Sequence, residues 1–427
     1  MVSPRLVSVL LVVTLAAACS GSSRDDSTAP SSSTTTTTKP ARADDVLTLG
    51  QLAPLTGPVE TIADSFTTPV RLAVEEMNFS GGVNGKPVGL VVADDGSAIE
   101  TGTAAFTKLV DTDHVDAVIG PSTSQLAVQL RDQSTNSHPV VICSGSNSYG
   151  PLSERNGDRY YFRTAPSDRL QAAALAHLVV VQGHGRPMVI AAPRDTYTSP
   201  FGAEVMRELR RLKARPLPLV SFAPGQDPTR AISRGLRGNP DSLVLIGFPD
   251  AVAPALRALI AANHGPQQTP TYGSDGLQTG DLGALVDPAN PWVVAGIIGT
   301  TPAGAPAGID HPFNAQLAAT GTEPFFSAST YDCAILVGLA AIAAGSDDPR
   351  AISRHFARNL RGSVTCSTFF DCATALGRGR TINYQGAASD YRKWGGFEPG
   401  TGTYDVWRMG LDARPVLDPP ANQIRVP

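Results

Sequence analysis

The sequence has little of what recognition of charged polymers requires. Aromatic residues make up 6% of its 427 residues, and the formal net charge at pH 7 is −4. Without a basic stripe, binding to nucleic acid is not expected, because its phosphates need clustered Lys and Arg. The basic residues are 29 Arg and 5 Lys, a bias from which we draw no functional conclusion.

Sequence signatures of catalysis and metal binding are also missing. The seven histidines show no HExxH or His-x-His spacing, so we expect no metal site. There is no Walker loop, no Gly-x-Gly-x-x-Gly after an apolar run and no Gly-x-Ser-x-Gly elbow, so neither a cofactor nor an enzymatic activity is expected. Only Asp94-Asp95, at the end of an apolar run, could be read as a pair of carboxylates for acid–base chemistry.

The N-terminus contains one apolar run, residues 6–18, which follows Arg5 and is too short to span a bilayer. It predicts a secretory signal. The stretch Leu15-Ala-Ala-Ala-Cys19 resembles the lipobox of bacterial lipoproteins, although Ala16 stands where that box more often carries leucine. We therefore expect residues 1–19 to be a lipoprotein signal peptide with a lipidated Cys19. The alternative is an ordinary signal peptide with a chance cysteine.

Residues 20–45 are rich in Ser and Thr and contain no large apolar residue. Such a segment cannot bury enough apolar surface to offset its chain entropy, so it predicts a disordered tether. The remaining body of about 380 residues is too large for one core and suggests two lobes. No second membrane segment is apparent in it.

Apolar runs of strand length alternate with helical segments along the body, as in repeated βα units of a parallel sheet. The expected strands are 47–52, 88–93, 115–119, 140–143, 188–192, 217–222, 243–248 and 293–298. Residues Phe66, Val70, Ala73 and Met77 recur at helical spacing, and helices are also expected over 101–111, 123–135, 167–181, 201–213, 251–263 and 327–344.

Hydroxyl-rich turns follow two of these strands directly. Residues 120–124 read Gly-Pro-Ser-Thr-Ser and residues 144–149 read Ser-Gly-Ser-Asn-Ser-Tyr. In doubly wound sheets, ligands lie beyond the carboxyl ends of strands, and a helix N-terminus favours an anion. Either turn alone is an ordinary loop sequence. Together they predict one wall of a ligand site, with a carboxylate as the simplest guest.

The ordered segments Leu49–Gly57, Gly81–Gly85, Gly120–Ser124 and Phe162–Asp168, with Tyr272-Gly-Ser-Asp-Gly276 and Ile382–Gly386, resemble the type 1 periplasmic binding proteins. Within them the chain is similar to the branch that serves branched-chain amino acid and amide ABC importers, the Leu/Ile/Val-binding protein-like family. The resemblance covers most of residues 46–410. It implies an α/β fold of two doubly wound parallel-sheet lobes joined by a three-crossing hinge. Lobe 1 would hold residues 46–167 and 300–385, and lobe 2 residues 168–299 and 386–427.

The resemblance also implies a binding site. The hydroxyl that receives the ligand's α-carboxylate falls on Ser124, beside Thr123, and a second polar loop falls on Ser146, Asn147 and Ser148. The acidic residue for the α-ammonium falls on Asp275. Two aromatic candidates complete this set, Phe201 in lobe 2, where many relatives carry tyrosine, and Tyr331 at the start of a helix.

Departures from the family pattern concern these same regions. Phe201 lacks the hydroxyl of tyrosine and Phe248 adds an apolar face, which leaves room for a flatter or more apolar carboxylate than a branched-chain amino acid. The Asp94-Asp95 pair falls where relatives close a strand and face a loop, so no catalysis is expected there.

Apart from Cys19, four cysteines allow three disulfide connectivities in an oxidising compartment. The segment from Cys366 to Cys372 resembles a cysteine-flanked loop of some family members, so we predict that pair. Cys143 ends an apolar strand and Cys333 lies in an apolar helix. For these two, buried thiols packed as small hydrophobes are the favoured interpretation.

The sequence thus predicts an extracytoplasmic solute-binding lipoprotein, anchored by lipid to the outer face of the cell membrane. It would capture a small amphipathic solute, an amino acid or related carboxylate, and deliver it to an ABC permease with its ATPase. A ligand-sensing envelope or signalling protein with the same fold is the alternative. An exported hydrolase would need a nucleophile and base that the sequence does not provide.

Overall fold

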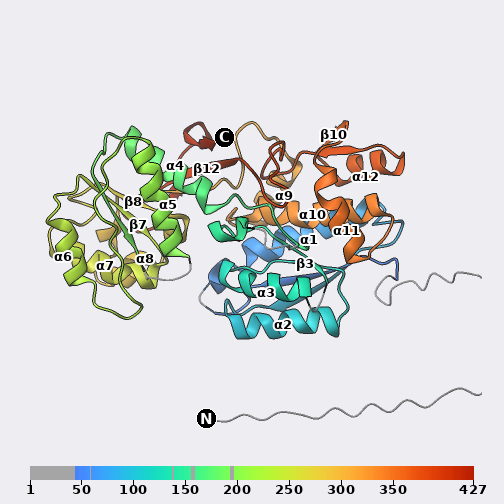
Figure 1. Cartoon of the computed structure of the whole chain (residues 1–427), viewed down its shortest axis with the longest axis horizontal. Coiled ribbons are helices and arrows are strands. Elements are labelled where there is room, and N and C mark those ends of the chain that lie inside the picture. The colour runs from blue at the N-terminus through green and yellow to red at the C-terminus, as the bar shows by residue number, and fades with distance from the viewer. Residues whose placement is uncertain (1–43, 58, 137–138, 155–158, 193–196) are drawn as a thin grey trace, which may run out of the picture. The chain divides into compact units, whose positions relative to one another are not determined.

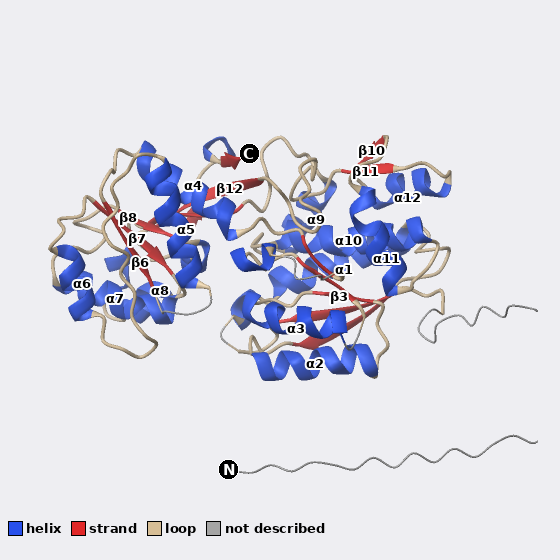
Figure 2. Ribbon diagram, viewed as in Figure 1, coloured by secondary structure: helices blue, strands red, loops and turns tan. Residues whose placement is uncertain are grey.

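The computed structural model describes residues 44–427 except 58, 137–138, 155–158 and 193–196 (Figure 1). The predicted signal peptide, Cys19 and nearly all of the tether lie outside the described residues. These described residues form one compact unit. Within it, two large sheets are each covered by helices on both faces (Figure 2).

The first sheet has five parallel strands in the order β2-β1-β3-β4-β5. Their bounds are Thr48–Ala53 (β1), Gly89–Asp94 (β2), Ala117–Ile119 (β3), Val141–Ser144 (β4) and Tyr161–Arg163 (β5). The chain order reverses between β1 and β3. At such a switch point the loops after the two strands leave toward opposite faces, which opens a crevice between them.

Successive residues of these strands serve opposite cores. Ala117 and Ile119 contribute to a large cluster, whereas Val118 between them contributes to a second one. The helices of this part of the protein either cover the first sheet or pack beside the covering helices. They are α1 (Asp64–Phe79), α2 (Ile99–Asp111), α3 (Ser124–Asn136), α9 (Pro312–Thr320), α10 (Ser327–Ala344), α11 (Pro349–Phe356) and α12 (Phe369–Gly377). Because both faces are covered, the strands read as continuous apolar runs rather than alternating ones.

The second sheet is mixed and has seven strands. Four parallel strands, β6 (Pro187–Ala191), β7 (Ser242–Ile246), β8 (Thr271–Gly273) and β9 (Ile298–Pro302), are followed by the antiparallel strand β12 (Gly402–Met409), with β13 (Pro415–Leu417) and β14 (Ile424–Val426) on β12. Its helices are α4 (Asp168–Val181), α5 (Thr198–Arg211), α6 (Thr229–Leu236), α7 (Pro249–Ala261) and α8 (Leu282–Val286). Here too, Val189 faces one core and Ile190 the other.

Smaller elements complete the fold. A parallel pair, β10 (Val364–Cys366) and β11 (Ile382–Tyr384), packs beside α12. Short 3-10 helices are η1 (Glu60–Ile62), η2 (Gly150–Ser153), η3 (Asp275–Leu277), η4 (Pro291–Val294), η5 (Ala357–Asn359) and η6 (Pro420–Asn422). We call the first sheet with its helices lobe 1 and the second sheet with its helices lobe 2.

The chain crosses between the lobes three times. Crossings follow β5, β9 and the segment that ends near Pro399, and residues from all three line one cavity of about 20 Å³. The amide of Ala303 also donates to the carbonyl of Thr403 at 2.9 Å. The three connections therefore run side by side. A cavity of this size has room for about one water molecule.

The second and third crossings do not fall where the sequence placed them. Thr300 and Thr301 lie in β9 of lobe 2, so that crossing follows Pro302. Four residues after Gln385 pack into the large core of lobe 1, namely Ala387, Tyr391, Trp394 and Phe397. Asp332 of α10 holds this segment, because its carboxylate accepts hydrogen bonds from the Tyr384 and Tyr391 hydroxyls and from the amides of Ala387 and Ala388.

Two predicted strands of lobe 2 differ in the structure. Residues 217–222 run beside β6 but form only an isolated bridge, Val220 to Ile190. Pro216 and Pro218 have no amide hydrogen to donate, which prevents a longer ladder. The predicted strand 293–298 is replaced by η4, which begins at Pro291, and pairing begins only at Ile298.

Both cysteine pairs are disulfide-bonded. The Cys366–Cys372 bridge confirms the predicted pair. The interpretation of Cys143 and Cys333 as free thiols is wrong, since they form a second disulfide with Cα atoms 5.6 Å apart. Their separation of 190 residues hid the pair in the sequence, and the packing of α10 on β4 creates it.

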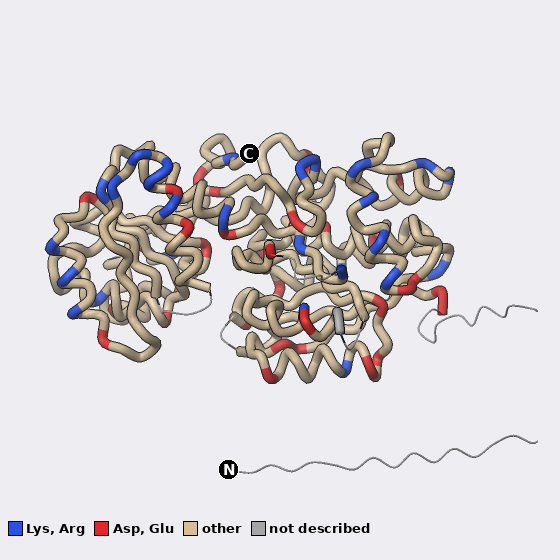
Figure 3. The backbone as a smooth tube through the Cα atoms, in the orientation of Figure 1, with Lys and Arg blue, Asp and Glu red and all other residues tan. Residues whose placement is uncertain are grey.

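One helix in the described part of the chain, α10, is long and apolar enough to cross a membrane, but 83% of it is buried inside the protein. It is the central helix of the lobe 1 core. Acidic and basic residues are interspersed along the described backbone (Figure 3).

Candidate functional site

The first wall of the site lies at the carboxyl ends of β3 and β4. Ser124 is the first residue of α3, and Thr123 precedes it. Both side chains are half-buried. The Ser124 hydroxyl oxygen accepts the Tyr149 amide at 3.3 Å, so the hydroxyl proton can still be donated to a ligand. Backbone amides at the start of α3 add to the attraction for an anion.

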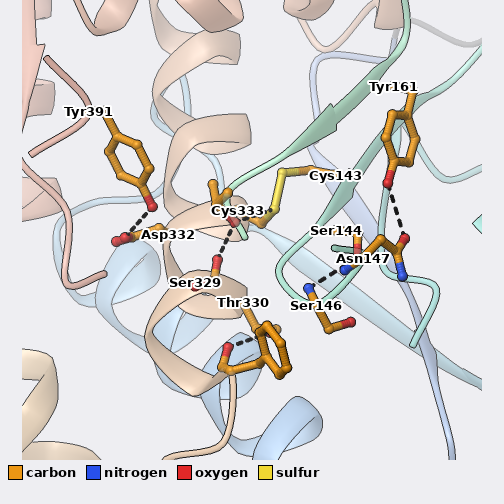
Figure 4. Close-up of a disulfide and its surroundings, with 12 residues drawn as sticks. Cys143, Ser144, Ser146, Asn147, Tyr161, Ser329, Thr330, Asp332, Cys333 and Tyr391 are labelled. Atoms are coloured by element: carbon orange, nitrogen blue, oxygen red, sulfur yellow. Dashed lines mark hydrogen bonds between the residues drawn. A yellow bond between two sulfur atoms is a disulfide. The ribbon is translucent and has the colours of Figure 1, made fainter. Parts of the chain in front are cut away.

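The loop after β4 is fixed to the loop after β3 by side-chain hydrogen bonds. Ser144 donates to the carbonyl of Pro121 at 3.2 Å and accepts the amides of Ser146 and Asn147 at 3.2 and 3.1 Å (Figure 4). Ser146 donates to the carbonyl of Ser122 at 2.9 Å. The two hydroxyl loops therefore form one unit, as the sequence predicts for neighbouring strand ends.

Asn147 belongs to the support of this unit. Its side-chain amide donates to the Pro121 carbonyl at 3.1 Å, and its side-chain oxygen accepts the Tyr161 hydroxyl at 3.2 Å. It is fully buried, as is Arg163, which donates to the carbonyls of Asn147 and Tyr149 at 2.9 Å each. The Arg163 guanidinium is also paired with Glu398. This arginine positions the loop and has its charge already matched.

The Asp94-Asp95 pair likewise connects loops. One oxygen of Asp95 accepts both the amide and the hydroxyl of Ser122, at 2.9 and 2.6 Å, and the other accepts the Ser97 amide. Asp94 accepts the amide and hydroxyl of Thr56, from the loop after β1. These carboxylates hold the strand-end loops together.

The second wall is an acidic cluster formed by Asp275, after the carboxyl end of β8, and Asp168, at the start of α4. Asp275 begins η3 and is 7% exposed. It accepts hydrogen bonds from the Gln171 side-chain amide at 3.0 Å and the Tyr197 hydroxyl at 3.2 Å. Burial raises the pKa of Asp275 above its usual value. The rings of Tyr197 and Phe248 lie 5.4 Å apart, and Phe248 is 46% exposed.

A second carboxylate, Asp168 at the start of α4, belongs to the same cluster and is 1% exposed. Burial raises its pKa to about 7; the negative charge of Asp275 acts in the same direction, whereas the Ser148 hydroxyl and the Arg163 charge oppose it. Neither Asp168 oxygen has a hydrogen-bond partner of good geometry among the described residues. Two like charges held out of water need an outside cation or a proton.

Other buried polar atoms around this cluster also lack a partner among the described residues. They are the side-chain oxygens of Gln171, Thr300, Thr301 and Tyr404. Native interiors satisfy nearly all such groups, so a concentration of unsatisfied ones is typical of a site completed by a ligand or water. Burial raises the pKa of Tyr404, and the negative charges of Asp168 and Asp275 raise it further. The three side chains therefore lie close together.

The two walls are in direct contact. The backbone amide of Asp168 donates to the carbonyl of Ser148 at 2.7 Å. Ser148, which the sequence assigned to the hydroxyl loop, is 5% exposed and lies beside the Asp168 side chain. The hydroxyl loops and the acidic cluster therefore adjoin, at the point where the chain first crosses between the lobes.

The structure does not bring Phe201 or Tyr331 to either wall. Phe201 is fully buried in a core of lobe 2, and Tyr197, four residues earlier, takes the place beside Asp275. Tyr331 is fully buried in lobe 1, where its ring stacks on Phe313 at 4.4 Å and its hydroxyl bonds to Glu76. Apolar neighbours at helical spacing draw both rings into a core.

Sequence reasoning missed Asp168 and Tyr197. Asp168 ends the segment Phe162–Asp168, but an aspartate at the start of a helix is ordinarily interpreted as a helix cap. In this helix no side-chain cap is formed, and the carboxylate is buried instead. That combination is visible only in three dimensions.

Comparisons with known proteins agree with this architecture. The family model described as periplasmic binding protein matches residues 46–375. The chemotactic signal transduction system substrate-binding protein BasB of Halobacterium salinarum is 26% identical over 390 residues, 88% of this chain and 90% of the relative. The Leu/Ile/Val-binding protein BraC3 of Rhizobium johnstonii is 31% identical over 157 residues, 37% of this chain and 41% of the relative.

Solved structures show the same fold. The leucine binding protein LivK of Thermotoga maritima superposes with a TM-score of 0.69 at 18% identity, over 88% of this chain and 98% of that one. The substrate binding protein LivJ of Streptococcus pneumoniae, in complex with isoleucine, gives a TM-score of 0.64 at 18% identity, over 87% of this chain and 100% of that one.

Proposed function

The chain belongs to the periplasmic binding protein family, and part of it is similar to a Leu/Ile/Val-binding protein. We therefore propose that it captures an amino acid or a related carboxylate outside the cytoplasm. It would deliver this solute to an ABC permease driven by its ATPase. Binding alone is the activity, and no chemical step is proposed. The predicted alternative, a ligand sensor, is considered below.

The contact between the two walls is the observation that carries this proposal. On one side stand the Ser124 hydroxyl and the N-terminus of α3, which suit a carboxylate. On the other stand Asp275 and Asp168, which suit an ammonium group. An α-amino acid carries these two charges on one carbon, and the walls adjoin through Ser148 and Asp168.

A pair of aspartate variants tests the acidic cluster. Asp275→Asn should weaken L-leucine at least about 100-fold, because it removes a buried counter-charge worth about 3–5 kcal/mol. Its effect on 4-methylpentanoate, which lacks the amine, should be much smaller. Calorimetry on both ligands measures the difference.

Asp287→Asn is the matched control. Asp287 is a turn aspartate of the same lobe that accepts the amides of Ala289 and Asn290 at the surface. Equal losses for both ligands in Asp275→Asn, or no more loss than in the control, would show that Asp275 is only a turn residue. A thermal-shift screen of amino acids, amides and aromatic acids identifies the ligand beforehand, since ligand at a hundred times its dissociation constant adds about 2.7 kcal/mol of stability.

We also propose that lipidation of Cys19 anchors the protein to the outer face of the membrane, with residues 20–45 as tether. The charged start, the apolar run and the small residues before Cys19 support it. Membrane fractionation of wild type and Cys19→Ala tests it. Wild type should sediment with membranes and the variant should not, and equal solubility would refute the anchor.

The alternative, a ligand sensor without transport, is favoured by one specific observation. The similarity to BasB, named as part of a chemotactic signal transduction system, extends over 88% of this chain. Neighbouring permease and ATPase genes would favour import. A sensor or transducer gene beside it would favour signalling.

A further inference from the structure

The buried disulfide Cys143–Cys333 lies directly beneath the hydroxyl loops. Cys143 is in β4, one residue before Ser144, whose side chain organises the loop of residues 144–149 (Figure 4). Cys333 is in α10, and both cysteines are fully buried. The bridge therefore joins the base of this loop to the central helix of lobe 1.

The loop and α10 are in close backbone contact at the same place. A Cβ atom added to Gly145 would lie 2.3 to 2.4 Å from the backbone nitrogen, Cα and hydroxyl oxygen of Thr330, so only glycine fits here. Thr164, at the first crossing, donates to the carbonyl of Ser329 at 2.6 Å and lies 3.1 Å from the Cys333 sulfur. The start of α10 thus supports both the loop and the crossing.

The hydrogen bonds of the loop reach the loop after β3 and the strand β5, where Tyr161 and Arg163 donate to Asn147. Ser144 and Asn147 bind Pro121, and Ser146 binds Ser122. Pro121 and Ser122 belong to the loop after β3, which together with the loop of residues 144–149 forms the candidate binding site for a carboxylate. The disulfide adds a covalent connection from the base of the loop to α10, the buried helix whose Asp332 accepts the Tyr384 and Tyr391 hydroxyls.

From this placement we propose that the Cys143–Cys333 disulfide positions the two hydroxyl loops, residues 120–124 and 144–149, and that the intact bridge raises the affinity for carboxylate-bearing ligands. The proposal rests on the proposed function, and it extends it by assigning the bridge to ligand binding rather than to stability alone. Cys143 and Cys333 are positioning residues in this scheme. They act through Ser144 and touch no ligand themselves.

The chain contains a matched control, the Cys366–Cys372 disulfide. It lies in the same lobe and the same core cluster, and it joins β10 to α12. The experiment compares the full chain with Cys143→Ala/Cys333→Ala and with Cys366→Ala/Cys372→Ala. If the first variant does not fold, Cys143→Val/Cys333→Ala restores part of the lost volume.

Two measurements separate positioning from mere stabilisation. The first is calorimetry with L-leucine and with 3-methylbutylamine, which has the same side chain and amine but no carboxylate. Loss of the Cys143–Cys333 bridge should weaken L-leucine about tenfold, as when a charge-assisted hydrogen bond is misplaced, and leave the amine within about twofold. The control variant should leave the ratio of the two affinities unchanged.

The second measurement is amide hydrogen exchange of the ligand-free proteins. Exchange at residues 144–149 should rise when Cys143–Cys333 is removed and stay as in wild type when Cys366–Cys372 is removed. Unchanged exchange in the loop, or equal weakening of leucine and amine, would overturn the proposal. If wild type binds no amino acid and no related carboxylate in the thermal-shift screen, the proposed function fails, while the exchange measurement still decides the role of the bridge.

Discussion

Replacing Asp168 by Asn should stabilise the ligand-free protein at alkaline pH and leave it nearly unchanged at acid pH. The Asp168 carboxyl is 1% exposed, and burial together with the Asp275 charge raises its pKa from 3.8 to about 7. An acid with a raised pKa binds its proton more tightly in the folded state. Stability is therefore lost as the pH rises from about 4 to about 7.

The size of the effect follows from the pKa. A shift from 3.8 to about 7 corresponds to about 4 kcal/mol at most, reached above pH 7. Asn has nearly the same shape but no charge, so Asp168→Asn should recover much of this above pH 7. Below about pH 4 both side chains are neutral, and the two proteins should unfold alike.

Urea unfolding at pH 4.5, 6 and 8 measures this difference. The gain in the free energy of unfolding for Asp168→Asn should grow with pH. A variant that is equally or less stable than wild type at pH 8 would refute the reasoning, since it would mean that the carboxylate has a partner the variant loses.

Ligand binding supplies the converse test. A bound ammonium group favours the charged carboxylate, so L-leucine should displace a proton from Asp168 below pH 7, and its affinity should rise between pH 5 and 7.5. Calorimetry in two buffers of different ionisation enthalpy counts the released proton. In Asp168→Asn this proton release should decrease, leaving only the proton released by Asp275, whose pKa burial also raises.

Three further predictions concern lobe 1. Ser124→Ala should weaken carboxylate ligands by about 1.5–3 kcal/mol in calorimetry, and an unchanged affinity would remove Ser124 from the site. Asp332→Asn should lower the free energy of unfolding at neutral pH by about 1–3 kcal/mol, because an amide has only one acceptor oxygen for the four donors that share the carboxylate; equal urea midpoints would contradict this. Loss of the Cys143–Cys333 bridge should lower the free energy of unfolding by about 5 kcal/mol, and loss of Cys366–Cys372 should lower it by about 2 kcal/mol, because the first bridge closes a far longer loop of chain. Equal decreases in urea unfolding would contradict this entropic reasoning.

Much of the architecture was predictable because continuous apolar runs mark strands that are covered on both faces. The runs at 47–52 and 88–93 became β1 and β2, and the helix expected over 327–344 became α10 with the same bounds. Predictions failed where a local chemical feature overrides hydrophobicity. The prolines at 216 and 218 reduce an apolar run to a bridge, and Pro291 starts a 3-10 helix.

The hydroxyl loops of the candidate site were predictable, because each of them lies in one continuous stretch of sequence. Hydroxyl residues that follow a strand and begin a helix are visible in one stretch, so Ser124 and the loop of residues 144–149 could be named. Asp168 and Tyr197 could not, because their meaning depends on meeting Asp275, more than seventy residues away in the chain. The Cys143–Cys333 bridge was missed for the same reason.

The position of Asp168 also indicates how ligand binding would couple to the hinge. Its amide is bound to Ser148 of lobe 1, while its carboxylate belongs to the acidic cluster of lobe 2. A ligand whose carboxylate is held by α3 and whose ammonium is held by Asp275 gains its full binding energy only when the two walls adjoin. The ligand therefore shifts the hinge equilibrium toward the arrangement in which the walls adjoin. The size of the shift is set by the ratio of the ligand's affinities for the adjoining and the separated arrangements. An amine without a carboxylate contacts one wall alone, so it should bind without shifting the hinge equilibrium. Small-angle scattering should therefore show a more compact protein with L-leucine and no change with 3-methylbutylamine.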